Sequence, residues 1–361
     1  MRIAFVCDTA YQVLNALNYV YANKAKEGLE ADLFVGYQFH NAEELSCRLR
    51  KESVFANIYG YHPRRKSVGI VEKLQRIYQI MTPMKTVHSY LAEPAQLRDK
   101  DYAQIFMSLP TQFSVAMAFA YPNAEIYAFD DGIGSYEGGI GLSAVSKFNQ
   151  IIYRIVGKDL SRVIPKAVYL NNPAFYRGNE SVKALPSLAD APQEFWGILE
   201  RVWQYPNDGY YSRYKFICLT QPNDDNLPGS DAIQDAMLDG MMSHKEHCMV
   251  RPHPRQQDLQ VNGLTLDNHR DMWELVCAGQ IDDSHVLVSL FSTSQLIPKM
   301  FYDREPTLVF TGWMMPGGVT EASGAACMKV IDRLRQQYTH PERIFVPKSR
   351  EEYEELLQML G

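Results

Sequence analysis

The residue best suited to acid–base chemistry in this 361-residue sequence is His253, which lies between Pro252 and Pro254. The two prolines restrict the backbone on both sides and hold the imidazole in one place. An imidazole titrates near neutral pH and is able to protonate a leaving group or donate a hydrogen bond to it. Arg251 and Arg255 flank the triplet and would add charge-assisted contacts to a phosphate. The alternative is a histidine that only caps the following segment.

Two hydroxyls form a second candidate group. Ser292 and Ser294 follow the apolar run 286–290, at the start of a predicted helix at 293–301. Hydroxyls and backbone N–H groups that converge at the start of a helix favour an anion. The alternative is that Ser292 serves only as an N-cap.

Two groups of aspartates are candidates for a general base, which contributes roughly 10²–10⁴ in rate. Asp130 and Asp131 precede Gly132 at the end of a predicted strand, and Asp224 follows the first strand of the second half. In an open parallel sheet, ligands bind beyond the carboxyl ends of the strands, so both groups fall where substrates are expected. The alternative for each group is a turn-forming aspartate.

These residues need a scaffold, and the hydrophobic pattern predicts strands that alternate with helices in two series. The first series has strands at 2–7, 31–36, 103–107 and 124–129 and helices starting near 10, at 43–49, at 70–81 and at 111–120. The second has strands at 214–220, 248–251, 285–290 and 307–310 and helices at 232–242, 270–278 and 293–301. Such alternation predicts α/β domains with parallel sheets. The proline-containing stretch 185–206, with one amphipathic helix, separates domains at 1–200 and 201–361.

Three short motifs resemble the bacterial lipooligosaccharide and capsule sialyltransferases of glycosyltransferase family 52. They are Phe129-Asp130-Asp131-Gly132, Arg251-Pro252-His253-Pro254-Arg255-Gln256 and Phe291-Ser292-Thr293-Ser294. The resemblance extends through 121–126 and 263–266 and covers most of 103–310. It implies the GT-B architecture, in which two Rossmann-like domains face each other across a cleft. The N-terminal domain would lie on the acceptor side and the C-terminal domain would bind the donor.

The resemblance also implies an activity, which is inverting transfer of sialic acid from CMP-sialic acid to a sugar hydroxyl of a bacterial surface glycan. A terminal galactose linked alpha-2,3 is the expected acceptor. His253 would act on the departing phosphate, and the segment around Ser292 and Ser294 would cradle it. The base would be Asp224, although different spacing leaves Asp225 open. Gln221, in the same loop, would bind substrate. Asp130 and Asp131, with Gly132, would shape the acceptor side or supply the base instead.

Two further residues are candidates for substrate binding. Glu274, on the predicted helix 270–278, is placed to accept hydrogen bonds from the ribose hydroxyls of the nucleotide, and an exposed helix glutamate is the alternative. Gln12, in the first helix, is a candidate for the acceptor or the sialic acid carboxylate, and an ordinary first-turn polar residue is the alternative.

Composition narrows the partners. A formal net charge of −6 and a pI near 5.9 argue against a protein that grips nucleic acid by neutralising phosphates. Six scattered cysteines favour a reducing compartment. The histidines lack metal-ligand spacing, so we expect neither a metal nor any cofactor beyond the donor. The absence of a signal peptide and of a long apolar stretch predicts a cytoplasmic protein. The basic run Arg64-Arg65-Lys66 leaves peripheral contact with the inner membrane face open, and a homodimer is also open.

Three rival functions remain. A transferase for another acid sugar, such as Kdo, would use the same monophosphate site. A nucleotide-sugar epimerase of GT-B architecture would need contacts for a pyrophosphate and a uracil. A carbohydrate-binding protein without activity would not need His253 for affinity.

Overall fold

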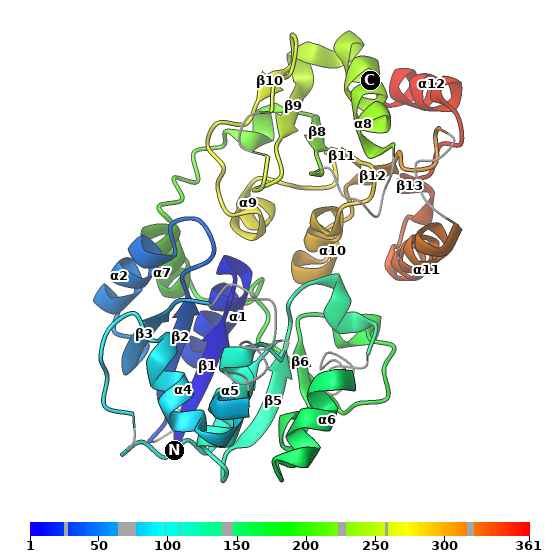
Figure 1. Ribbon diagram of the computed structural model, residues 1–361. Helices are drawn as coiled ribbons and strands as arrows, with labels where there is room; N and C mark the ends of the chain where they lie inside the picture. The colour runs from blue at the N-terminus through cyan, green and yellow to red at the C-terminus, as the bar shows by residue number, and fades with distance from the viewer. Residues whose placement is uncertain are drawn as a thin grey trace. The chain divides into compact units, whose positions relative to one another are not determined.

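The computed structural model describes residues 1–24, 28–63, 77–97, 99–108, 110–138, 147–222, 229–256, 259–315 and 321–361. The chain divides into two compact units, Met1–Val202 and Trp203–Gly361 (Figure 1). Each unit is built on its own parallel sheet. The division lies close to position 200, where the sequence places the boundary between the domains.

The first unit has a seven-stranded sheet with the order β3-β2-β1-β4-β5-β6-β7, and all its described pairings are parallel. Its strands are β1 (Arg2–Cys7), β2 (Glu30–Gly36), β3 (Asn57–Tyr61), β4 (Gln104–Met107), β5 (Glu125–Phe129), β6 (Val168–Leu170) and β7 (Val182–Ala184). Its helices are α1 (Ala10–Ala22), α2 (Ala42–Lys51), α4 (Pro83–Tyr90), α5 (Gln112–Ala120), α6 (Lys147–Ile155) and α7 (Gln193–Trp203). Short 3-10 turns are η1 (Ile133–Tyr136), η3 (Leu160–Val163) and η4 (Pro173–Phe175).

Local sequence explains why the first unit's central elements form where they do. Phe5 of β1 is fully buried and stacks on Phe106 of β4 at a centroid distance of 4.5 Å. Strands buried on both faces read as continuous apolar runs, as β1 does. Thr9 caps α1 by accepting from the Gln12 N–H, and Thr111 opens α5 with a capping box.

The second unit has a six-stranded sheet with the order β10-β9-β8-β11-β12-β13, and all its described pairings are parallel. Its strands are β8 (Phe216–Leu219), β9 (Cys248–Arg251), β10 (Thr265–Leu266), β11 (Val286–Ser289), β12 (Thr307–Phe310) and β13 (Ile344–Phe345). Its helices are α8 (Ser230–Gly240), α9 (Trp273–Gly279), α10 (Ile297–Tyr302), α11 (Glu321–Gln337) and α12 (Arg350–Leu360). Its 3-10 turns are η5 (Tyr211–Arg213), η6 (Met241–His247), η7 (Thr293–Leu296) and η8 (Pro341–Arg343).

The two predicted series of strands and helices are confirmed, and the predicted bounds of β1, β9 and β12 agree with the structure. The prediction that helix 70–81 simply stops before Pro83 is incomplete. Residues 77–81 are helical, 70–76 lie outside the described ranges, and Pro83 begins the additional helix α4. Proline suits that first position because its missing N–H has no helical partner there. The sequence prediction also missed several elements, namely β3, β6, β7, β10, β13, α6, α11 and α12.

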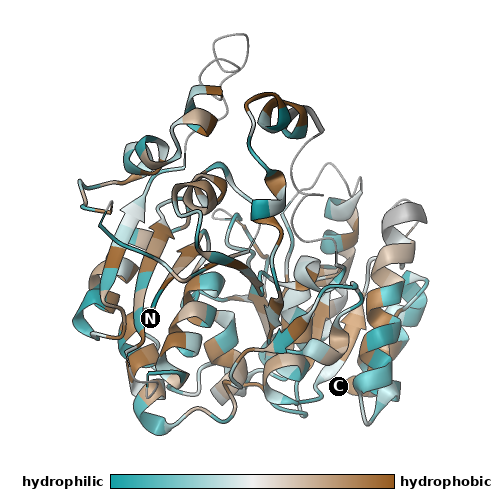
Figure 2. Cartoon of the chain, turned by 90° about the horizontal axis from the view of Figure 1, so that it is seen from below, coloured by the Kyte–Doolittle hydropathy of each residue, from teal (hydrophilic) through white to brown (hydrophobic). Residues whose placement is uncertain are grey.

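Hydropathy follows this architecture. Strand ribbons are largely apolar, while many helices carry apolar residues on one side and polar residues on the other (Figure 2). Such patterning is typical of helices that pack on a sheet and face water. In the described ranges, every helix is too short or too polar to cross a bilayer.

Candidate functional site

Polar side chains gather at the carboxyl edge of the first sheet. Asp8 follows β1, Ser108 follows β4, Asp130 and Asp131 follow β5, and Asn171 follows β6. These strands are neighbours in a parallel sheet, so their ends meet at one edge. The sequence-predicted residues of this unit lie there together.

Asp130 is fully buried and has a structural role at this edge. One carboxylate oxygen accepts from the Gly132 N–H at 2.9 Å. The other accepts from the Asn171 backbone N–H and side-chain amide, both at 3.1 Å, and from the Tyr136 hydroxyl. Burial raises the pKa of Asp130, and these hydrogen bonds oppose the rise. Since its carboxylate is enclosed, Asp130 positions the ends of β5 and β6 and presents no surface to a substrate.

Gly132 makes the turn that directly follows the two aspartates. Its φ of 94° and ψ of −165° lie in a region that only glycine adopts without strain. Ser135, in the 3-10 turn that follows, accepts from the Asp131 N–H at 2.9 Å. The turn therefore leaves Asp131 partly exposed while Asp130 is buried.

Gln12 links Asp131 to the other strand ends. Its buried amide nitrogen donates to Ser108 Oγ at 2.7 Å and to Asp131 Oδ1 at 2.5 Å, and its oxygen accepts from the Asp8 N–H. Burial raises the pKa of Asp131, and the hydrogen bond from Gln12 lowers it. The negative charges of Asp130 and Asp8 raise it further. Gln12 thus orients Asp131, and the carboxylate keeps a more basic character than a surface aspartate.

Sequence reasoning did not include Asp8 among the site residues. Its carboxylate accepts from Tyr61 OH at 2.6 Å and from Gln38 Nε2 at 2.8 Å. Burial raises its pKa, and the Tyr61 bond opposes the rise. A side chain on Gly36 would lie 2.9 Å from this carboxylate, so glycine makes room for it. The available signal was position, because Asp8 directly follows an apolar strand in the same way as Asp130.

In the second unit, the predicted residues follow three adjacent strands. His253 comes two residues after β9, Gln221 two residues after β8 and Ser292 three residues after β11, and β8 lies between the other two strands. Two hydrogen bonds fix the imidazole: the His253 N–H donates to Thr220 Oγ1, and Nδ1 accepts from the Arg255 N–H, both at 3.1 Å.

This geometry selects one tautomer of His253. Because Nδ1 is an acceptor, the proton of the neutral ring is on Nε2. Burial lowers the pKa of His253, and the charge of Arg255 lowers it further, so the ring is neutral at pH 7. Within the described residues Nε2 has no protein partner, and it is available as a donor to a ligand.

Gln221 was predicted to contact substrate, and the structure gives it a positioning role. Its side chain bonds the Phe291 backbone in both directions, as donor to the carbonyl and as acceptor from the N–H at 3.3 Å. Its own N–H donates to Gln234 Oε1 at 2.8 Å. On the other side, Thr220 Oγ1 donates to Gln256 Oε1. The end of β8 is therefore tied to the turn after β9 and to the end of β11.

Arg251 is also engaged inside the unit, contrary to the expectation of a phosphate contact. Its guanidinium donates to Asp267 at 2.6 Å, to Tyr211 OH at 3.0 Å and to the Asp271 carbonyl. It also lies over the Trp273 ring, 5.2 Å from the centroid. Asp267 is fully buried, and its carboxylate would be a costly unpaired charge without the guanidinium of Arg251. The side chain of Arg255, in contrast, is exposed.

Ser292 acts as the N-cap that the sequence left as an alternative. Its hydroxyl accepts from the Ser294 N–H at 3.3 Å, and the segment begins as a 3-10 turn rather than directly as an α-helix. The carbonyl of Ser294 accepts from the Trp273 indole at 2.7 Å. Glu274 is in the first turn of α9 and half-buried. The sequence therefore predicted that a helical segment begins at Thr293, but it did not predict the hydrogen bond between the Ser294 carbonyl and Trp273.

The predicted bases Asp224 and Asp225 lie outside the described residues, as does the basic run at 64–66. Across the described ranges, His, Cys, Asp and Glu side chains do not gather in threes that fit a metal ion. Metal independence stays a prediction.

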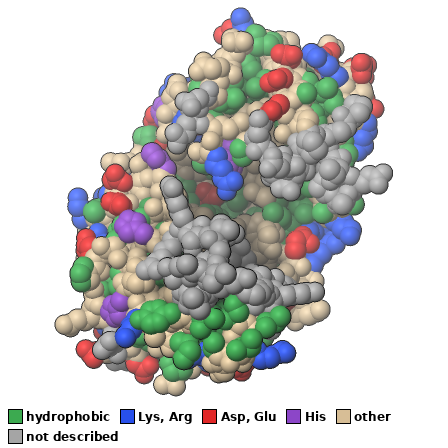
Figure 3. All heavy atoms as spheres, in the orientation of Figure 1, with side chains coloured by type: hydrophobic (Ala, Val, Ile, Leu, Met, Phe, Trp, Pro, Cys, Tyr) green, Lys and Arg blue, Asp and Glu red, His purple; other side chains and the backbone are tan. Residues whose placement is uncertain are grey.

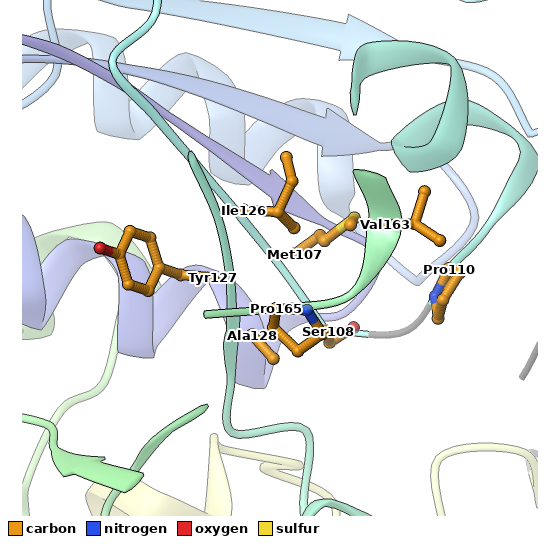
Figure 4. A pocket seen from close by; sticks show the side chains of 8 residues that line it. All are labelled: Met107, Ser108, Pro110, Ile126, Tyr127, Ala128, Val163 and Pro165. Carbon is orange, nitrogen blue, oxygen red and sulfur yellow. The ribbon is translucent and has the colours of Figure 1, made fainter. Parts of the chain in front are cut away.

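A small, mainly apolar pocket borders the polar network of the first sheet at Ser108. Its lining includes Met107, Ile126, Val163 and Pro165, which surround the ends of β4 and β5 (Figure 4). Ser108 is its one link to the polar network described above. We give the pocket no role in catalysis, because hydrocarbon side chains dominate its wall.

Comparisons with known proteins support the fold. No protein-family model matches the chain, and no curated protein matches its sequence. A solved UDP-N-acetylglucosamine 2-epimerase is similar with a TM-score of 0.50 and 10% identity, over 99% of this chain and 86% of that one. Arabidopsis thaliana UGT89C1 is similar with a TM-score of 0.50 and 10% identity, over 97% of this chain and 85% of that one. The chain therefore has two Rossmann-like α/β domains of the kind found in GT-B enzymes.

Proposed function

We propose that this protein is a glycosyltransferase that moves a sialic acid from CMP-sialic acid to a hydroxyl of a glycan. The observation that carries the proposal is the imidazole of His253, held as the Nε2–H tautomer at the carboxyl edge of the second sheet. The likeness to solved structures supports the scaffold, and the motif resemblance supports the donor.

The leaving group explains why a neutral imidazole suits this reaction. A phosphate monoester has a second pKa near 6, so it departs at pH 7 without needing a full proton. It does need its developing charge stabilised as the bond to the anomeric carbon breaks. The Nε2–H of His253 is a fixed donor for that charge, and its lowered pKa keeps the ring from carrying a second proton. Arg255, exposed beside it, adds positive charge.

The monophosphate site is assembled within the second unit alone. Ser292 follows β11 and His253 follows β9, and β8 is the one strand between them. The hydrogen bonds of Thr220 and Gln221 tie the ends of these three strands together. The chain after β8, which contains Asp224, begins between them. In the proposed mechanism Asp224 takes the acceptor proton, the sugar is displaced in one step, and its anomeric configuration inverts.

Turnover of a histidine variant tests the proposal. Full-length protein would be incubated with CMP-sialic acid and a lactose-type acceptor, and CMP release and the product linkage would be measured. His253→Ala is expected to lower kcat at least about tenfold because the leaving phosphate loses its donor. Unchanged turnover would remove His253 from the mechanism.

A matched control is His247→Ala. His247 is exposed and directly precedes β9, so it lies at the opposite edge of the same sheet. We expect this variant to keep wild-type turnover and the same circular dichroism spectrum.

Ligand-induced stabilisation separates the rival enzymes. A ligand present at about 100 times its Kd stabilises the folded state by about 2.7 kcal/mol, so CMP should raise the thermal midpoint. A larger rise with uridine diphosphate, together with conversion of UDP-N-acetylglucosamine, would favour an epimerase. Turnover with CMP-Kdo but not CMP-sialic acid would keep the mechanism and change the sugar.

A further inference from the structure

Helix α6 of the first unit carries isoleucines on both its inner and outer sides. Ile152 is buried, and the neighbouring Tyr153 ring stacks on Phe119 of α5 at 5.5 Å. Ile151 and Ile155, four residues apart on one helix face, are 56% and 78% exposed. Helix α6 packs on the unit through Ile152 and Tyr153, whereas the side chains of Ile151 and Ile155 are turned mostly to solvent.

The exposed isoleucines belong to a wider apolar surface. Ile164, the residue that ends η3, is 43% exposed, and η3 packs against both α5 and α6. Tyr78 and Met81, exposed by 58% and 59%, lie just before α4, which packs against α5. Figure 3 shows hydrophobic side chains gathered over α6 and α4. Five of the eight large exposed hydrophobic residues in the described ranges thus belong to this group of helices.

The charge of this surface differs from that of the chain. The ranges 77–91, 112–120 and 150–164 contain four basic residues, Lys85, Arg154, Lys158 and Arg162, and one acidic residue, Asp159. Arg162 is half-buried and donates to the carbonyls of Tyr121 and Ala124, so it is left out of the surface charge. The remaining balance is +3 − 1 = +2, whereas the whole chain has a net charge of −6. Arg154 is exposed and lies between the two outer isoleucines along α6.

We infer that the outer face of α6, together with Ile164, docks on the surface of an anionic phospholipid bilayer. Outward aliphatic side chains enter the boundary between headgroups and acyl chains, while adjacent basic side chains meet the lipid phosphates. Apolar contacts alone would not require a local excess of positive charge on a protein whose net charge is negative. The charge is thus the observation that selects an anionic lipid as occupant over a second copy of this acidic chain.

Vesicle sedimentation of the full chain tests this inference. The probes are vesicles of phosphatidylcholine and phosphatidylglycerol at a ratio of about 7:3, and vesicles of pure phosphatidylcholine. Wild-type protein should sediment with the anionic vesicles and be released as salt rises from about 0.05 to about 0.5 M. The double variant Ile151→Ser/Ile155→Ser should bind at least about tenfold more weakly. Arg154→Glu should bind at least about fivefold more weakly.

The matched control is Met242→Ser/Met359→Ser, which removes two exposed apolar side chains from the second unit. It should bind the anionic vesicles as wild type does. Equal binding of wild type and the isoleucine variant, or no binding by wild type, would overturn the inference. A wild-type dimer in analytical ultracentrifugation that becomes monomeric in the isoleucine variant would also overturn it, since the face would then bind another copy. None of these residues belongs to the proposed active site, so turnover with a soluble acceptor reports on the proposed function separately.

Discussion

At the carboxyl edge of the first sheet, polar side chains mostly bond to one another, whereas at the edge of the second they are fixed largely through backbone groups. Gln12 joins Ser108 and Asp131 directly through side-chain atoms. His253, in contrast, is held by its own N–H and by the N–H of Arg255. The first edge is rich in carboxylates and the second presents a neutral imidazole beside an arginine. Two sheets of similar topology thus offer different chemistry at equivalent positions.

The difference teaches which ligand group suits which edge. A phosphate would be repelled by the carboxylates of Asp8 and Asp131, and the charge of Asp8 already contributes to the raised pKa of Asp131. Sugar hydroxyls are neutral donors that carboxylates accept well. In the proposed function, the donor phosphate therefore belongs to the second edge, and Asp131 is a candidate contact for a hydroxyl-rich ligand.

The largest expected effect tests whether the guanidinium of Arg251 is held by Asp267 and so is not available to a ligand. Asp267→Ala should lower the free energy of unfolding by about 3–5 kcal/mol, because it removes the buried carboxylate and leaves a partly buried guanidinium without its partner. Urea unfolding followed by circular dichroism measures the change. The double variant Arg251→Met/Asp267→Ala should recover much of the loss. A single variant as stable as wild type would break the comparison, since Arg251 would then be free to bind an anion.

The next effect tests how tightly the first edge is built. A Cβ on Gly36 would lie 2.9 Å from Asp8 Oδ1 and 3.1 Å from the Tyr61 ring. Gly36→Ala should therefore cost about 1–3 kcal/mol of unfolding free energy, because the buried pair has to move apart. Gly134→Ala is the control, since a Cβ there meets nothing within 4 Å, and it should change stability by less than about 0.5 kcal/mol. Equal stability of the two variants would mean that the Asp8–Tyr61 contact is loose.

The smallest effect concerns pH. The folded-state pKa of Asp131 is raised above its ordinary value of 3.8, so the folded protein binds this proton more tightly than the unfolded chain. Stability due to Asp131 is therefore greatest below that value and falls as pH rises from 3.8 through the raised pKa. Asp131→Asn has no carboxyl group to ionise, so it does not lose stability in this way as pH rises. Its thermal midpoint should exceed that of wild type by about 2 °C at pH 7. The difference should shrink toward pH 4.

The exposed Asp159 provides a control of opposite sign. Its pKa is lowered by hydrogen bonds from Ser161, so its carboxylate form favours the folded state. Asp159→Asn should not raise the thermal midpoint at pH 7. If both variants were stabilised alike, relief of net negative charge rather than burial of Asp131 would be the cause.

Periodicity in the sequence was enough to predict most of the scaffold. β1, β9 and β12 each contain a short apolar run, which Asp8, Arg251 and Thr311 follow, and such runs are typical of buried parallel strands. β10 has only two residues and β3 contains a glycine, so neither has a strong local signal. They exist because neighbouring strands supply their hydrogen-bond partners.

The site could be predicted only in part for a related reason. That polar residues after parallel strands meet at one edge is a rule of topology, and it placed Asp130 and Asp131 at the sheet edge where the structure has them. It did not single out Ser108 or Asp8, which follow neighbouring strands at the same edge. Which partner each side chain selects is decided by residues far away in sequence. Arg251 pairs with Asp267, and Gln221 bonds Phe291, and no local pattern marks either contact.

Asp130 and Asp131, which precede the turn at Gly132, are adjacent and chemically identical but differ in burial. The first aspartate is fully buried among its hydrogen-bond partners, and the second is partly exposed to solvent. The two carboxylates therefore meet different physical demands. We expect natural variation at 130 to be limited by folding, and variation at 131 to follow whatever molecule the protein has to recognise.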